Sequence, residues 1–343
     1  MLLTVFAGIC NGTFALPMKF ATKWNWENIW GVFIVWGFVI FPIMLGVFTI
    51  PHLGQILIEV GLLDLFYIFL FGLLWGIGSI CFGLGIRYIG IGLAFSINIG
   101  ITIAVGALLP LFRDGVIGNA SSESIHSVIV GVMFIIVGVA INGYAGALRE
   151  KSSRLPSAQP VPSAEPRTRN TTLIGIILCL FAGLFSPMLQ VSFIYGDSIL
   201  QVAAKMGTSE TLASNAIWII ALAGGFVVNL VYILWLFNRN NSFKRFKTKG
   251  TGGYHALAFI MGFLWVVTIA CYGMAVSNMG SLGLSVGWAV FNSVGIATAN
   301  LLGLFTNEWR VVDRKTLIVL FVGLLILVLG TCIVGMAEFP RNN

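Results

Sequence analysis

Long apolar segments alternate with short polar connectors along the whole chain. A helix needs about 20 apolar residues to cross the hydrocarbon core of a membrane. Nine segments satisfy this requirement, at 29–50, 65–86, 91–112, 127–148, 173–195, 212–237, 256–276, 282–305 and 316–336, and a shorter apolar segment at 2–16 is predicted as the first of ten spanning helices. The pattern predicts an all-α polytopic membrane protein. Its first five helices lie in 1–148, a flexible Ser/Pro/Arg-rich linker follows at 149–171, and five more helices lie in 172–343.

The third and eighth predicted helices share a pattern at a fixed offset of 190 residues. The shared residues are Gly72, Leu74, Trp75, Cys81, Gly83 and Gly90, which match Gly262, Leu264, Trp265, Cys271, Gly273 and Gly280. A repeat of half the chain length suggests a duplicated transporter fold. Shared composition of two glycine-rich apolar helices is the alternative explanation.

The basic residues predict the orientation of the helices. Sixteen of the nineteen Lys and Arg residues lie in odd-numbered connectors. The positive-inside rule then places these connectors in the cytoplasm and both termini outside. Since each half has five helices, the halves enter the membrane in opposite directions. The sequence therefore predicts two inverted five-helix repeats, which place the substrate near the midplane at their interface.

Composition narrows the function classes. The 343 residues are 58% hydrophobic and 9% charged, whereas an ordinary soluble domain has about 25% charged residues. The net charge of +7 is explained by topology, and no nucleic-acid motif is present. The five cysteines lack metal-ligand or disulfide spacing. No nucleotide-binding, metalloprotease or serine-hydrolase motif occurs, so we expect neither an enzyme nor a bound cofactor or metal.

Uncharged polar residues and tryptophans at membrane depth are the candidate site. No Asp, Glu, Lys or Arg lies near the middle of a predicted helix, which favours a small neutral substrate. Amides bond sugar hydroxyls, and indoles offer a flat apolar face to a pyranose. The expected substrate-binding residues are Asn11, Trp75, Asn98, Gln190, Trp265 and Asn292. Each could instead hold helices together. Lys19 and Arg87, at helix ends, are candidates for gating or for simple membrane anchoring.

Several short stretches resemble one family. These are Trp75–Gly78, Arg87–Gly90, Ile99–Thr102, Lys23–Glu27, the Gly224-Gly225 pair with Asn229-Leu230, and Glu308-Trp309. They look like the bacterial L-rhamnose–proton symporter family of the drug/metabolite transporter superfamily. The resemblance implies a multi-pass protein of the bacterial inner membrane that imports a deoxysugar with protons as the coupling ion. The alternatives are an exporter of amphipathic metabolites, an uncoupled facilitator, and a scaffold that does not transport.

Overall fold

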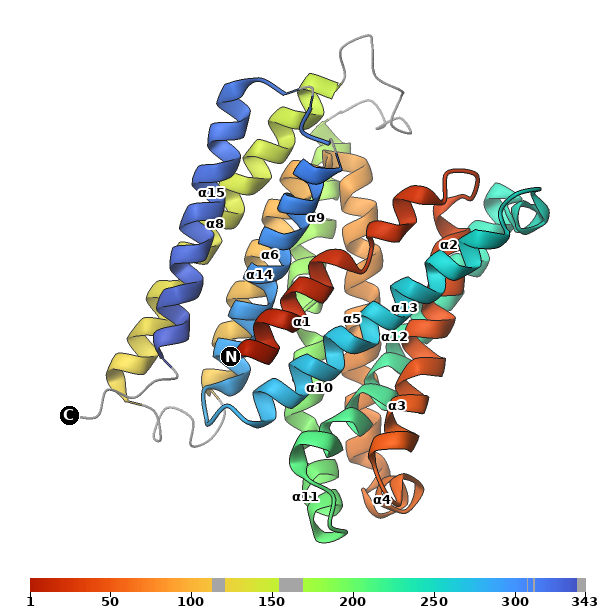
Figure 1. Cartoon of the computed structure of the whole chain (residues 1–343), viewed down its shortest axis with the longest axis vertical. Coiled ribbons are helices and arrows are strands. Elements are labelled where there is room, and N and C mark those ends of the chain that lie inside the picture. Colours follow the sequence, from red (N-terminus) through yellow and green to blue (C-terminus); the bar gives the residue numbers. More distant parts are fainter. Residues whose placement is uncertain (113–120, 154–168, 307, 311, 338–343) are drawn as a thin grey trace. The chain divides into compact units, whose positions relative to one another are not determined.

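The computed structural model describes residues 1–112, 121–153, 169–306, 308–310 and 312–337, and all regular elements in these ranges are helical (Figure 1). Ten stretches of the described residues are long and apolar enough to cross a membrane, which confirms the predicted number. The elements are α1 (Leu2–Thr13), η1 (Leu16–Phe20), α2 (Trp26–Ile34), η2 (Val35–Ile40), α3 (Phe41–Thr49), α4 (Leu53–Glu59), α5 (Leu62–Ile89), α6 (Ile91–Leu108), η3 (Leu109–Phe112), α8 (Ser122–Ser153), α9 (Arg169–Phe185), α10 (Met188–Tyr195), α11 (Asp197–Lys205), α12 (Glu210–Asn240), η4 (Phe243–Lys247), α13 (Gly252–Ser277), α14 (Gly283–Phe305) and α15 (Arg314–Met336).

Helices α8 and α9 extend into the two ends of the predicted linker 149–171. Residues 154–168, its centre, lie outside the described residues. Elsewhere the predicted spans coincide with helices to within a few residues.

Two predicted helices depart from regular α-helical geometry near their middle, and a proline lies at each of these places. The second is continuous through α2, η2 and α3, but η2 is a π-helical segment. Pro42 follows it and cannot donate a backbone N–H to the Phe38 carbonyl, which its ring also crowds. A wider turn upstream relieves this conflict. The sixth predicted helix is interrupted between α9 and α10, where Pro187 stands.

The chain forms two compact units, and each takes segments from both halves of the sequence. Unit 1 comprises Met1–Ile77 and Met188–Asn278, and unit 2 comprises Gly78–Pro187 and Met279–Asn343. One boundary falls inside α5 and another falls between α9 and α10.

In unit 1, α13 packs against α1, η1, α2 and η2, and α12 packs against α2, α3 and α13. Glycines allow these helices to approach closely. A Cβ added to Gly262 of α13 would lie 2.7 Å from the Cβ of Trp36 and 3.0 Å from the backbone nitrogen of Gly37 in η2. Small residues at such contacts are typical of helix packing in membranes.

In unit 2, α8 and α15 lie side by side (Figure 1). Gly131 and Gly330 meet at their contact, since a Cβ on Gly330 would lie 2.8 Å from the Gly131 carbonyl oxygen. Helix α6 packs against α8, α9 and α14.

Candidate functional site

Two predicted site residues stack on each other in unit 1. The rings of Trp75, from α5, and Trp265, from α13, are nearly parallel, with centroids 5.7 Å apart and 12° between their planes. These are the equivalent tryptophans of the 190-residue sequence pattern. Trp265 is 8% exposed and Trp75 is half-buried. The fold therefore brings the two repeated positions into direct contact.

Phenylalanines from the end of α1, from α2 and from η2 extend the contacts of this indole pair. Phe14, just past the end of α1, lies 5.3 Å from Trp265 between ring centroids. Phe38 of η2 contacts both indoles, at 5.3 Å from Trp75 and 6.1 Å from Trp265. Phe33 contacts both phenylalanines, at 5.7 and 5.5 Å. We call these five residues the aromatic cluster. No sequence signal marks its phenylalanines, because they are three of many in apolar runs.

The aromatic cluster contains one polar group that lacks a partner. The Nε1 atom of Trp265 is buried and makes no hydrogen bond to any residue that the structure describes. A buried donor without a partner costs about 1–3 kcal/mol. A ligand hydroxyl beside this indole would satisfy the donor while its apolar face packs on the rings.

Gly225 of α12 holds Trp75 in place. A Cβ on Gly225 would lie 2.6 Å from Cζ3 and 2.7 Å from Cε3 of Trp75, which is closer than real Cβ contacts. The benzene ring of this indole therefore packs directly against the α12 backbone.

The other predicted residues of unit 1 are dispersed over several elements. Asn11 is half-buried on α1, one turn before Phe14, so both lie on the same face of the helix. Gln190 is 1% exposed on α10. Lys19 is exposed at the end of η1.

The predicted residues of unit 2 make contacts typical of helix packing. Asn98 of α6 is 3% exposed and accepts a hydrogen bond from Ser186 Oγ at 3.5 Å. Asn292 donates from Nδ2 to the Trp288 carbonyl within α14, at 2.9 Å. Trp288 itself donates from Nε1 to the Thr102 carbonyl of α6, at 3.0 Å. Arg87 is exposed in the last turn of α5.

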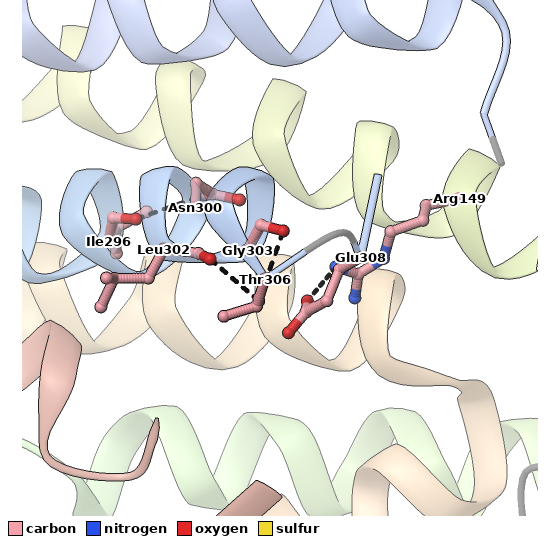
Figure 2. A network of polar contacts seen from close by, with 7 residues as sticks. All are labelled: Arg149, Ile296, Asn300, Leu302, Gly303, Thr306 and Glu308. Carbon is pink, nitrogen blue, oxygen red and sulfur yellow. Dashed lines mark hydrogen bonds and ion pairs between the residues drawn. The ribbon is translucent and has the colours of Figure 1, made fainter. Parts of the chain in front are cut away.

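Unit 2 contains an ion pair outside the residues that the sequence predicts for the site. Arg149, near the end of α8, donates to Glu308 Oε2 at 2.6 Å, and its guanidinium lies 4.8 Å from the Trp309 ring centroid (Figure 2). The two side chains are 21% and 31% exposed. Figure 2 also shows Thr306 donating to the carbonyls of Leu302 and Gly303 at the end of α14. The pair ties the end of α8 to the segment between α14 and α15. In the sequence, only Glu308 of this pair belongs to a stretch that resembles the family, the Glu308-Trp309 stretch.

The described residues contain no group of three His, Cys, Asp or Glu side chains that could hold a metal ion. The aromatic cluster offers flat apolar surfaces and, at Trp265 Nε1, a buried donor without a partner among the described residues, a combination that suits non-covalent binding of a ligand.

Comparison with known proteins gives a family. The profile of the L-rhamnose-proton symport protein family matches residues 2–339. An L-rhamnose-proton symporter of Mannheimia succiniciproducens is 29% identical over 329 residues, which cover 94% of this chain and 93% of that protein. One from Yersinia pestis is 26% identical over 338 residues, with 94% and 93% coverage. No solved structure matches the chain. With a full-length family match and ten membrane-spanning helices, the chain belongs to the L-rhamnose-proton symport family of multi-pass membrane transporters.

Proposed function

We propose that this protein imports L-rhamnose or a closely related neutral sugar together with protons, by alternating access. The observation that carries the proposal is the stacked pair Trp75–Trp265 in a chain whose whole length matches a sugar symporter family. The indole faces suit the apolar C–H face of a deoxysugar, and Trp265 Nε1 supplies a donor for a hydroxyl. Asn11 and Gln190 are proposed as further polar contacts from unit 1. Asn98 and Asn292 stay predictions from the sequence.

The spacing of the indole pair limits how a sugar can bind. A ring held between two indoles needs two layers of contact of about 3.5–4.0 Å each, which is about 7–8 Å in total. The observed centroid separation is 5.7 Å. Insertion of a sugar therefore requires the indoles to separate, whereas stacking on one outer face does not. The indole–indole contact would be exchanged for indole–sugar contact, which keeps apolar surface covered throughout the cycle.

We place the protein in a bacterial inner membrane with the odd-numbered connectors in the cytoplasm and both termini outside, from the distribution of Lys and Arg. Residues 1–148 and 172–343 are then inverted repeats joined by a cytoplasmic linker. Lys19 and Arg87 are proposed to gate the cytoplasmic side. The Arg149–Glu308 ion pair, on the same side by this topology, is a further contact that must break if α8 separates from the end of α14.

Uptake of labelled L-rhamnose by cells without their own rhamnose carrier tests this function. We expect accumulation that a protonophore abolishes, because coupling to protons drives it. Uptake that stops when the sugar concentrations inside and outside are equal, and that resists the protonophore, would instead mean an uncoupled facilitator. Absence of uptake by folded protein in the membrane would reject L-rhamnose as the substrate. Trp235→Ala is a matched control for the indole variants below, since Trp235 is 47% exposed and lies outside the aromatic cluster.

A further inference from the structure

Two connectors of unit 1 form a strongly basic surface. Residues 17–28 run from η1 into the first turn of α2, and residues 238–255 run from the last turn of α12 into the first turn of α13. Together they carry seven Lys and Arg residues and a single carboxylate. All seven cations are exposed: Lys19, Lys23, Arg239, Lys244, Arg245, Lys247 and Lys249. We call these seven side chains the basic platform. Membrane topology accounts for the charge of such connectors, but it does not require them to fold against each other.

Hydrogen bonds join the two connectors into one structure. Lys23 Nζ donates to the Lys249 carbonyl at 3.3 Å, and the Arg245 guanidinium donates to the Lys23 carbonyl at 3.3 Å. Asn28 Nδ2 donates to the Ser242 carbonyl at 3.0 Å. Segments more than 200 residues apart in sequence therefore present their charges from one framework.

The only carboxylate of the connectors lies inside this framework. Glu27 is 4% exposed. Its Oε1 atom accepts hydrogen bonds from Ser242 Oγ at 2.6 Å, Asn240 Nδ2 at 2.9 Å and Asn25 Nδ2 at 3.1 Å. Because Glu27 is buried and bonded to neutral donors, the exposed surface of the connectors keeps its cations and no acidic side chain.

An aromatic core supports the platform. Trp24 is 7% exposed and meets Phe246, Tyr254 and His255 edge to face, at centroid distances of 5.0, 5.5 and 4.8 Å. In contrast to Trp24, Phe243 is 65% exposed, and it lies directly beside the cation Lys244 in the sequence. An exposed aromatic ring among cations at the end of a membrane-spanning helix is typical of a segment that lies in the lipid interface.

We propose that the basic platform, with Phe243, is a binding site for the headgroups of anionic phospholipids. Clustered Lys and Arg beside a spanning helix attract lipids whose headgroups carry a net negative charge, and Phe243 would enter the acyl boundary beside them. The hydrogen bonds through Glu27 and Lys23 hold the cations in place before a lipid arrives, which lowers the entropy cost of binding. The site is separate from sugar recognition and does not depend on which sugar is carried.

Native mass spectrometry of the purified full-length protein, titrated with phosphatidylglycerol or phosphatidylcholine, tests the proposal. The variant Lys244→Gln/Arg245→Gln/Lys247→Gln is expected to weaken phosphatidylglycerol binding on the order of a hundredfold, from roughly fivefold per cation. Phosphatidylcholine binding should not change. The control Arg310→Gln/Arg314→Gln/Lys315→Gln removes equal charge before and within the first turn of α15 and should bind phosphatidylglycerol as the parent does. Equal losses in both variants, or no loss in either, would overturn the site.

Two further measurements separate an organised site from simple charge attraction. Glu27→Ala raises the net charge by one, so attraction by charge alone predicts tighter binding of phosphatidylglycerol, whereas a pre-organised platform predicts weaker binding. If this variant does not fold, Ser242→Ala removes one of the same hydrogen bonds with no change of charge and carries the test. Inorganic phosphate is expected not to displace the lipid, because it lacks the acyl chains that Phe243 contacts. Full displacement by phosphate would refute a lipid site.

Discussion

Trp265 in unit 1 and Trp288 in unit 2 are buried to nearly the same extent, at 8% and 6% exposed, but their N–H groups differ. Trp288 donates to the Thr102 carbonyl, and its ring fills the space beside Gly106, where an added Cβ would lie 2.1 Å from Nε1. Trp265 has no such partner among the described residues. The Trp288 indole therefore completes a contact between helices, whereas Trp265 keeps a buried donor without a partner among the described residues. Burial alone therefore does not reveal the role of a membrane tryptophan.

Trp218 shows that a buried indole donor without a partner is not by itself a sign of a binding site. Its Nε1 atom also lacks a hydrogen-bond partner within the described part of the chain, but the residue is 1% exposed and is enclosed by Phe193 and Tyr272. Trp265 instead stacks on a half-buried indole. An unpartnered donor marks a candidate binding residue only where a ligand can reach it.

The largest effect is expected from removing the half-buried indole of the pair. Trp75→Ala should lower sugar uptake to about a tenth or less, because it removes one aromatic face and a stacking contact worth about 0.5–1.5 kcal/mol beyond its burial. Membrane abundance and the melting curve of the purified variant show whether it folds. Uptake equal to that of Trp235→Ala would contradict the role of Trp75.

Gly225→Ala is expected to act through Trp75 alone. The alanine favours the helix by about 0.5–1 kcal/mol, but its Cβ would lie 2.6 Å from the indole, so the ring must move. We expect a several-fold rise in KM for uptake with a smaller change in maximal rate. Gly83→Ala is the matched control, since a Cβ there meets no atom within 4 Å. Combining Gly225→Ala with Trp75→Phe should restore part of the loss, and failure of this smaller ring to help would argue against the mechanism.

Trp288→Phe should show the opposite pattern. The substitution leaves the Thr102 carbonyl without the Trp288 donor, at a cost of about 1–3 kcal/mol. We therefore expect a lower melting temperature with an unchanged KM for the sugar. A raised KM at unchanged stability would place Trp288 in the site and remove the contrast with Trp265.

A smaller effect is expected at the Arg149–Glu308 ion pair. Glu308→Gln removes a partly exposed charge pair, which is worth about 1 kcal/mol or less. Stability should fall slightly at low salt, and the difference from the parent should shrink at high salt, where the pair is screened. Thermal melting at two salt concentrations measures this. A difference that does not depend on salt would mean that the contact is not electrostatic.

The smallest effect is expected at Asp313, which caps α15. Hydrogen bonds from the Thr316 side chain and backbone lower the pKa of Asp313 below its ordinary value. Because the folded pKa is depressed, this stabilisation is present above the ordinary Asp pKa and is lost as the pH falls through the folded value. Asp313→Ala should remove that acid sensitivity in thermal melts. Unchanged acid sensitivity would assign it to other groups.

The sequence predicted the helices well because membrane spans depend mainly on the length and apolarity of a segment. It also singled out Trp75 and Trp265, since a repeated rare residue is visible without a structure. The π-helical segment at Val35–Ile40, and hence the position of Phe38, depends on how the backbone adjusts around Pro42. The Arg149–Glu308 pair joins residues 159 apart, so no local pattern shows it. Asn292 stays a prediction: the sequence places its amide at membrane depth, and its Nδ2 donates to the Trp288 carbonyl of the same helix, which no sequence pattern shows.

The most direct test of the central claim is binding of L-rhamnose to the purified protein, measured by isothermal titration calorimetry for the parent, Trp265→Ala and Trp288→Phe. We predict that the parent and Trp288→Phe bind the sugar with similar affinity, and that Trp265→Ala, still folded, shows no measurable binding. Binding by Trp265→Ala with the affinity of the parent would contradict the assignment of the aromatic cluster as the sugar site.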